Sequence, residues 1–263
     1  NALINLTNNL ILSSEISIRN DLDGIKKMEF FRKEKEKFLE TNEREPKVLI
    51  KTAFDMIDNC KESGTLQFSR LARLAFIGKI ILKSLVKKQI LNQRDYDSFL
   101  NSIATVATSI NLDFMLFLQN KINKDDFLSR YGHLRPGTYD ITSMRYDKNP
   151  NLLEMKSEIF FELAQKENFI LNEKLKEDVT KELHIHNLNF NSSSLFDFIK
   201  KSIEARELSK FEFTKSLSYA LELISEVGDI LGFSREDMAQ LDIDSLLKIQ
   251  DYDNKIKEIW NSL

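Results

Sequence analysis

Residues that interrupt helices are scarce and unevenly placed in this chain. Its 263 residues include only seven glycines and three prolines. Because proline and glycine are the poorest helix formers, the long stretches without them favour helices. Two of the prolines and two of the glycines fall within residues 131–150, which read YGHLRPGTYDITSMRYDKNP. We therefore predict a largely helical chain with one stiff polar loop at residues 131–150.

Apolar residues recur at steps of three and four along most of the chain, the spacing of one helix face. The residues at 66–91 are apolar nearly all round, which predicts a central helix covered by others. No strand-like alternation is long enough for a sheet. The pattern predicts an all-α fold, a single multi-helix bundle or orthogonal domain over residues 1–263. The predicted helices cover residues 15–41, 46–61 (ending at Gly64), 66–91, 94–121, 125–130, 152–166, 171–184, 192–231 (capped by Gly232) and 253–262.

Bulk composition excludes several kinds of partner. The net charge of −3 and a pI near 5.8 give no global basic field for nucleic acid or an anionic membrane. The most apolar run, from Leu74 to Val86, contains two lysines and is shorter than the roughly 20 residues of a membrane span. The single cysteine, Cys60, excludes an internal disulfide and fits a reducing compartment. We expect a cytoplasmic protein with no nucleic-acid or membrane partner.

Common catalytic motifs are missing from the sequence. It contains no phosphate-binding Gly-x-x-x-x-Gly-Lys-Ser/Thr loop, no Gly-x-Ser-x-Gly elbow and no His-Glu-x-x-His pair. Cys60 has no nearby histidine to activate it, so a nucleophilic role is not predicted. His184 and His186 are two residues apart, which directs them away from each other on a helix, and no third ligand is close in sequence. We therefore predict no metal site.

Cationic and polar side chains in and near the loop are the remaining candidates. Arginine guanidinium groups bind two oxygens of a carboxylate or phosphate at once, and an aspartate can accept from a substrate amine, amide or hydroxyl. Arg73 stands among apolar residues, where a buried guanidinium needs a partner; the alternative is a surface arginine. Arg206 and Lys210 are four residues apart and project from one helix face. The candidate residues of the loop are His133, Arg135, Tyr139, Asp140 and Arg145. The alternative for the whole loop is a plain connector between helices.

Three stretches carry a family resemblance. Residues 127–141 read FLSRYGHLRPGTYDI and are followed by Arg-Tyr-Asp at 145–147 and a proline at 150; residues 203–210 read IEARELSK; residues 228–247 read GDILGFSREDMAQLDIDSLL. They resemble the signature of the phosphoenolpyruvate-utilising enzymes, in particular the helical middle domain of phosphoenolpyruvate synthase-like and rifampicin phosphotransferase-like proteins. Residues 64–73, GTLQFSRLAR, and the run YGHLRPGTYDI look more similar to one branch of this family. That branch comprises capsule-associated enzymes that resemble the L-glutamine kinase of phosphoramidate biosynthesis.

The resemblance implies a multidomain phosphotransferase. In that family ATP phosphorylates a histidine on a swivelling domain, with release of AMP and phosphate, and the histidine carries the phosphoryl group to an acceptor on the helical domain. The 263 residues contain neither an ATP-grasp signature nor a swivelling-histidine segment, and they begin Asn-Ala without methionine. We expect a helical fragment, inactive alone, with residues 1–2 as a recombinant remnant. No cofactor is expected in it; ATP and Mg²⁺ would bind the nucleotide-binding domain of the full-length chain.

Roles for individual residues follow from this expectation. His133 and Asp140 are the predicted catalytic residues, assisting proton removal from the acceptor, and His133 is not the phosphoryl carrier. Leu134 and Thr138 depart from the rifampicin-type pattern, which argues against a rifamycin-like acceptor. The leading acceptor is L-glutamine. The alternatives are a non-catalytic helical interaction or scaffold module, and a phosphoenolpyruvate synthase-like enzyme with another acceptor. The predicted substrate-binding residues are Arg73, Arg135, Thr138, Tyr139, Arg145, Arg206 and Lys210.

Overall fold

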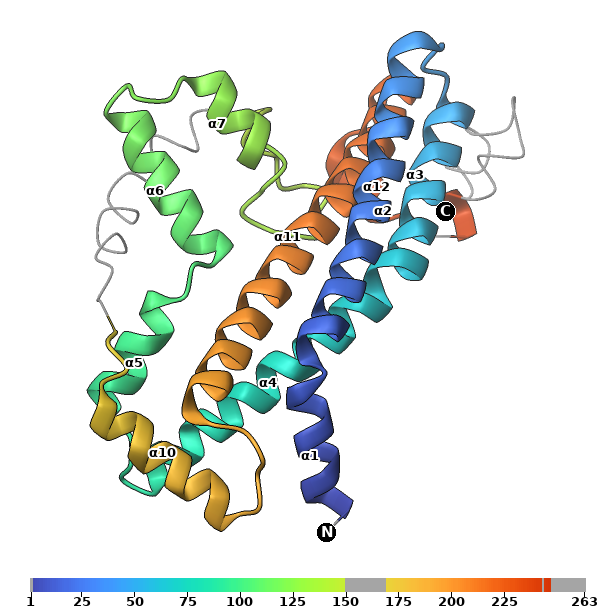
Figure 1. Ribbon diagram of the computed structural model, residues 1–263. Helices are drawn as coiled ribbons and strands as arrows, with labels where there is room; N and C mark the ends of the chain where they lie inside the picture. The colour runs from blue at the N-terminus through green and yellow to red at the C-terminus, as the bar shows by residue number, and fades with distance from the viewer. Residues whose placement is uncertain (1, 150–168, 243, 247–263) are drawn as a thin grey trace. The chain divides into compact units, whose positions relative to one another are not determined.

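The computed structural model describes residues 2–149, 169–242 and 244–246 (Figure 1). Every regular element in these ranges is a helix, which confirms the all-α prediction. The helices predicted at 152–166 and 253–262 lie outside the described residues. The elements are α1 (Ala2–Leu12), α2 (Ser14–Thr41), α3 (Pro46–Cys60), the π-helix η1 (Lys61–Thr65), α4 (Leu66–Lys87), α5 (Gln93–Ser102), α6 (Val106–Leu118), α7 (Lys124–Tyr131), α10 (Glu173–Ile185), α11 (Ser192–Leu231) and α12 (Arg235–Ala239).

Tertiary contacts divide the chain into two compact units. The first unit comprises residues 1–24, 66–116 and 158–211, and the second comprises residues 25–65, 117–157 and 212–263. The boundaries after residues 24 and 211 fall inside α2 and α11, so these two helices contribute to both units. A single domain over residues 1–263 stays a prediction.

The core of the first unit is formed by α4, α5, α10 and the first part of α11, with buried residues of α1 and the start of α2. Phe99 on α5 contacts Phe196 on α11 edge to face, with ring centroids 4.9 Å apart. Edge-to-face pairs of this kind contribute beyond the area they bury. Phe76 and Ile80 on α4 remain 57% and 63% exposed. The prediction of a helix covered on all sides at residues 66–91 was therefore wrong.

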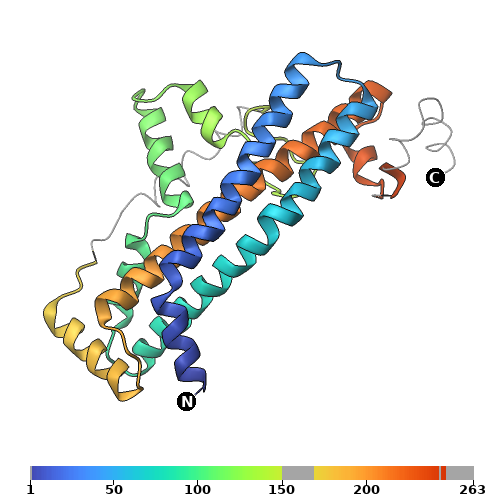
Figure 2. The same cartoon turned by 45° about the vertical axis from the view of Figure 1, so that its right-hand side comes forward.

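The second unit holds the polar loop. Figures 1 and 2 show α3 lying beside the second half of α2 and the C-terminal half of α11. Its core joins Leu39 of α2, Ile50 of α3 and Val227 of α11, all at most 2% exposed, with Met238 of α12. Ile141 of the loop packs into this same core. The loop is thus held by apolar burial as well as by its polar contacts.

Two of the predicted helices differ from the observed ones in their continuity. The predicted helix at 94–121 is broken between Ser102 and Val106, where Thr105 and Thr108 exchange hydrogen bonds between backbone N–H and side-chain oxygen. Such local bonds compete with the helical ones. Conversely, the helix predicted to end at Gly64 continues through η1 into α4. A Cβ at Gly64 would lie 2.7 Å from a ring carbon of Phe213, so this glycine permits close packing instead of a chain reversal.

Gly232 ends α11 in the left-handed conformation, with φ of +81°, as the sequence predicted. Apart from the adjacent residues, no atom lies within 4 Å of the position that a Cβ would take, so an added methyl group would meet no packed neighbour. We expect Gly232→Ala to lower the free energy of unfolding by about 1 kcal/mol, through backbone strain alone. Urea denaturation measures this change. Gly232→Asn should cost less, because asparagine tolerates this conformation; an equal cost for both would contradict the explanation.

Candidate polar cavity of the second unit

The polar loop is closed by backbone hydrogen bonds between its two ends. The Tyr146 N–H donates to the Leu134 carbonyl at 2.9 Å, and the Asp147 N–H donates to the Gly132 carbonyl at 3.1 Å. A Cβ at Gly132 would lie 2.8 Å from that of Asp147, so glycine allows this close approach. Gly137 does not use a positive φ, since Gly232 alone does so among the described glycines. We refer to residues 132–149 as the loop.

Arg135 fastens the loop to α11. Its side chain is fully buried and donates at 3.0–3.1 Å to the carbonyls of Asp140 and Ser143 within the loop and to the carbonyl of Ser218 on α11. Its Nη2 also lies 2.9 Å from Glu222 Oε1. Burial lowers the pKa of this guanidinium, and the Glu222 charge opposes that effect. These donors are directed at protein groups, so Arg135 acts on the loop; contact with a substrate stays a prediction.

Glu222 is shared by two arginines. Besides Arg135 it pairs with Arg235 of α12 through both carboxylate oxygens, at 2.7 and 3.1 Å. Arg235 also donates to the Ile141 carbonyl of the loop at 2.9 Å. Burial raises the pKa of Glu222, but the hydrogen bond and charge of Arg235, with the charges of Arg135 and Arg145, outweigh it and lower the pKa overall. One ionised carboxylate on α11 therefore joins the loop and α12.

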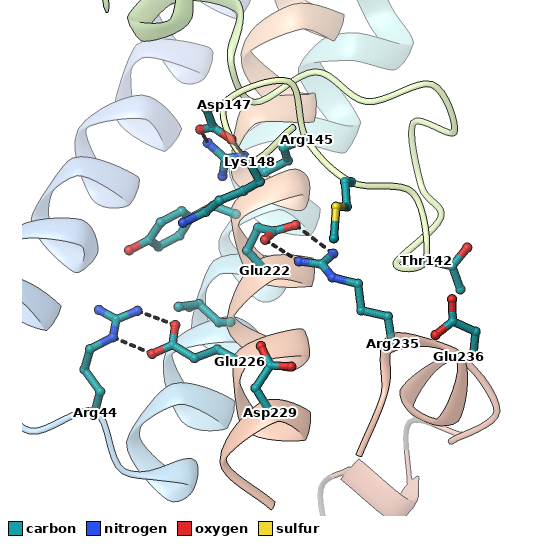
Figure 3. A pocket seen from close by; sticks show the side chains of 13 residues that line it. Arg44, Thr142, Arg145, Asp147, Lys148, Glu222, Glu226, Asp229, Arg235 and Glu236 are labelled. Atoms are coloured by element: carbon teal, nitrogen blue, oxygen red, sulfur yellow. Dashed lines mark hydrogen bonds and ion pairs between the residues drawn. The ribbon is translucent and has the colours of Figure 1, made fainter. Parts of the chain in front are cut away.

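A cavity of about 850 Å³ opens beside this carboxylate (Figure 3). The loop, α11 and α12 supply most of its wall, and a second bidentate pair, Arg44 with Glu226 at 2.5 and 2.6 Å, stands on it. Arg145 pairs with Asp147 at the loop side. The wall therefore carries both signs of charge. The lining residues are Arg44, Thr142, Met144, Arg145, Asp147, Lys148, Tyr219, Glu222, Leu223, Glu226, Asp229, Arg235 and Glu236.

The two predicted catalytic residues lie outside this lining. His133 is buried, and its pKa falls to about 3 because of burial and the nearby charges of Lys215, Arg145 and Arg32, so its ring is neutral at pH 7. Asp140 is exposed and accepts from the Thr142 hydroxyl and N–H, which lowers its pKa. A lowered pKa makes a carboxylate a weaker base. Their catalytic roles stay predictions.

The predicted substrate-binding residues separate into two groups. Among the loop candidates, Arg145 lines the cavity, whereas Thr138 and Tyr139 are exposed outside its lining. The other group, Arg73, Arg206 and Lys210, belongs to the first unit. There Arg73 and Lys210 are exposed, and the Arg206 guanidinium lies over the Phe76 ring, 5.6 Å from its centroid, and pairs with Glu207. A common site formed by both groups stays a prediction.

Sequence reasoning missed the acidic side of the cavity. Glu222, Glu226 and Asp229 are four and three residues apart along α11, so they share one face of the helix. This acidic stripe interrupts an otherwise apolar stretch and was visible in the sequence. It attracted no interpretation because charged helix positions are usually solvated. The arginines that pair with it are distant in sequence, and no local pattern connects them.

The described histidine and cysteine side chains have identifiable surroundings. No group of three histidine, cysteine or acidic side chains there is placed to hold a metal ion. His186 instead lies 2.9 Å from Glu182, one turn earlier on α10. Burial raises the pKa of the Cys60 thiol to about 11, so the reactive thiolate is scarce at neutral pH.

Comparisons of the chain with protein families, with characterised proteins and with solved structures gave no match. In the described part of the chain, no single helix has both the length and the apolarity of a membrane span. One bent pair, α5 with α6, meets those criteria together by length and composition, with 64° between the two helices.

Proposed function

We propose that this chain is the acceptor-binding helical part of an ATP-dependent phosphotransferase, and that the cavity of the second unit holds a small charged acceptor. The resemblance supplies the reaction class: a phosphohistidine formed elsewhere in the protein, with release of AMP and phosphate from ATP, gives its phosphoryl group to the acceptor. The same resemblance nominates L-glutamine as that acceptor. The chain's own residues would bind and orient it.

One observation supports the proposal most. Two loop residues that carry the resemblance, Arg145 and Asp147, line the wall of the cavity, next to Thr142, Met144 and Lys148 of the same loop. Sequence similarity and geometry thus point to the same place. The opposite wall is fixed by bidentate ion pairs, and such pre-organised polar groups orient a ligand without rearranging when it binds.

The binding step can be tested with the chain itself. We expect isothermal calorimetry to detect L-glutamine binding, and Arg145→Ala to weaken it about tenfold through loss of one charge-assisted contact. Lys37→Ala, on an exposed position of α2, is the matched control and should leave the affinity unchanged. In the natural protein that contains this sequence, AMP formation from ATP should depend on the acceptor. AMP formation unaffected by any small acceptor, together with no calorimetric signal, would refute the proposal.

A helical interaction or scaffold module remains the second candidate, because of apolar side chains at the start of the chain. Leu3, Leu6 and Ile16 are 76%, 63% and 57% exposed on α1 and early α2. Exposed apolar residues grouped together are a common feature of association surfaces. For this function, Leu6→Ser with Ile16→Ser should abolish association measured by sedimentation velocity, and Arg145→Ala should change nothing. Dependence of a reaction on Arg145 would favour the phosphotransferase.

A further inference from the structure

The charged side chains of α4 are all positive. The 22 residues of this helix include five arginines and lysines and no aspartate or glutamate, in a chain whose net charge is −3. The basic residues are Arg70, Arg73, Lys79, Lys83 and Lys87, and all five are exposed. Exposed helix faces usually mix both signs of charge, as on α2, where Lys33 pairs with Glu29 at 2.7 Å. The face of α4 therefore differs from an ordinary solvated one.

Most of this positive charge is uncompensated within the described ranges. Arg70, at one edge of the face, lies 3.4 Å from Asp21. The other four basic residues of α4 form no hydrogen bond or ion pair with any described residue. Their charges are therefore available to a partner.

Two large apolar side chains stand among these cations. Phe76 and Ile80 are 57% and 63% exposed. They lie at steps of three and four residues from Arg73, Lys83 and Lys87, so the five side chains share one side of the helix. At a rise of 1.5 Å per residue, the row is about 21 Å long. We refer to these five residues as the α4 stripe.

We propose that the α4 stripe docks onto an anionic lipid surface. The negative potential of such a surface attracts clustered lysines and arginines, and aromatic and aliphatic side chains enter the boundary between headgroups and acyl chains. The stripe presents both kinds of side chain in one row. The negative charge of the whole chain does not prevent this attraction, because salt limits electrostatic effects to about 10 Å. The inference is independent of the cavity in the second unit.

A nucleic-acid strand is the other polyanion that these charges would attract. Phe76 and Ile80 occupy the middle of the stripe, where phosphate groups would meet apolar surface. Stacking of a base on Phe76 is hindered, because the Arg206 guanidinium lies over this ring, 5.6 Å from its centroid. Both observations favour a lipid surface.

Sedimentation with vesicles tests the docking. We expect the chain to bind vesicles of phosphatidylcholine with about 30% phosphatidylglycerol about tenfold tighter than vesicles of phosphatidylcholine alone. Raising the salt concentration to about 0.5 M should weaken that binding about fivefold, because salt screens exposed charges. Equal binding to both kinds of vesicle, or no binding to either, would overturn the proposal.

Charge removal on the stripe locates the contact. Lys83→Gln with Lys87→Gln should weaken binding to the anionic vesicles about tenfold. Lys37→Gln with Lys47→Gln, at exposed positions of α2 and α3, removes the same charge and is the matched control. The control should retain the affinity. An equal loss in both variants would show that net charge alone determines binding, and the stripe would then not be the docking surface.

Removal of the apolar side chains separates a lipid surface from other polyanions. Phe76→Ser with Ile80→Ser should weaken vesicle binding about fivefold, because both side chains enter the headgroup boundary. An unchanged affinity would overturn the proposal, since positive charge alone would then be sufficient. A single-stranded oligonucleotide that binds more tightly than the anionic vesicles, and loses binding in the double lysine variant, would identify a nucleic-acid surface instead.

Discussion

Glu222→Gln is expected to lower the free energy of unfolding by about 3 kcal/mol, the largest effect of any single charge removal around the cavity. The substitution keeps the size of the side chain and removes its charge. It leaves the guanidinium of Arg135, which has no exposed surface, without its anionic partner. Breaking a buried ion pair from one side costs about 3–5 kcal/mol, because the remaining charge stays buried. Urea denaturation followed by circular dichroism measures the loss.

Glu226→Gln is the matched control for this substitution. Glu226 lies one turn further along α11 and also forms a bidentate pair with an arginine, but that pair is 32% and 41% exposed. Exposed pairs contribute less than about 1 kcal/mol, so the control should be close to the unsubstituted chain. Equal losses for both variants would show that the burial of Arg135 does not determine the effect.

Acid is expected to destabilise the chain through His133. Its pKa is about 3 in the folded chain and near the ordinary 6.5 when unfolded. Between these values the unfolded state binds a proton that the folded state does not, so stability falls as the pH falls below 6.5. From pH 7 to pH 5 the contribution is about 2 kcal/mol. The measurement is the free energy of unfolding in urea at several pH values.

His133→Gln should flatten that pH dependence by about 2 kcal/mol over the same interval, whatever its stability at pH 7. The readout is the slope, so a less stable variant still tests the prediction. His184→Gln, at an exposed position of α10, should keep the slope of the unsubstituted chain. An unchanged pH dependence in His133→Gln would mean that the folded protein also protonates the His133 ring between pH 7 and pH 5. Burial would then not lower the pKa of this ring.

The sequence was sufficient where local chemistry decides the structure. Periodicity predicted α2 and α11, and Gly232 ended α11 as expected. The capping box formed by Ser234 and Asp237 at α12 is equally local. Prediction from the sequence failed where residues far apart in the chain determine the structure. Gly64 looks like a helix end in the sequence, but the closeness of Phe213, which lies far along the chain, accounts for its place inside a continuous helical stretch.

The candidate site shows the same limit. The scarcity of proline and glycine elsewhere marked the loop, and Arg145, predicted to bind substrate, lines the cavity; its binding role stays a prediction. The partner of Arg135, however, is 87 residues away on α11. An ion pair between residues far apart in the chain leaves no periodic pattern in a single sequence. A buried structural arginine and a substrate-binding arginine therefore cannot be distinguished from the sequence. The acidic wall of the cavity was missed for the same reason.

The carboxylate shared by Arg135 and Arg235 has a consequence for local opening. A loop attached to its helix at one point can detach without disturbing its neighbours, and its amides then exchange with solvent quickly. Here the loop, α11 and α12 meet at Glu222, so none of them opens without separating a buried charge. Hydrogen exchange should therefore release the amides of Tyr146 and Asp147 together with that of Met238, as one cooperative unit.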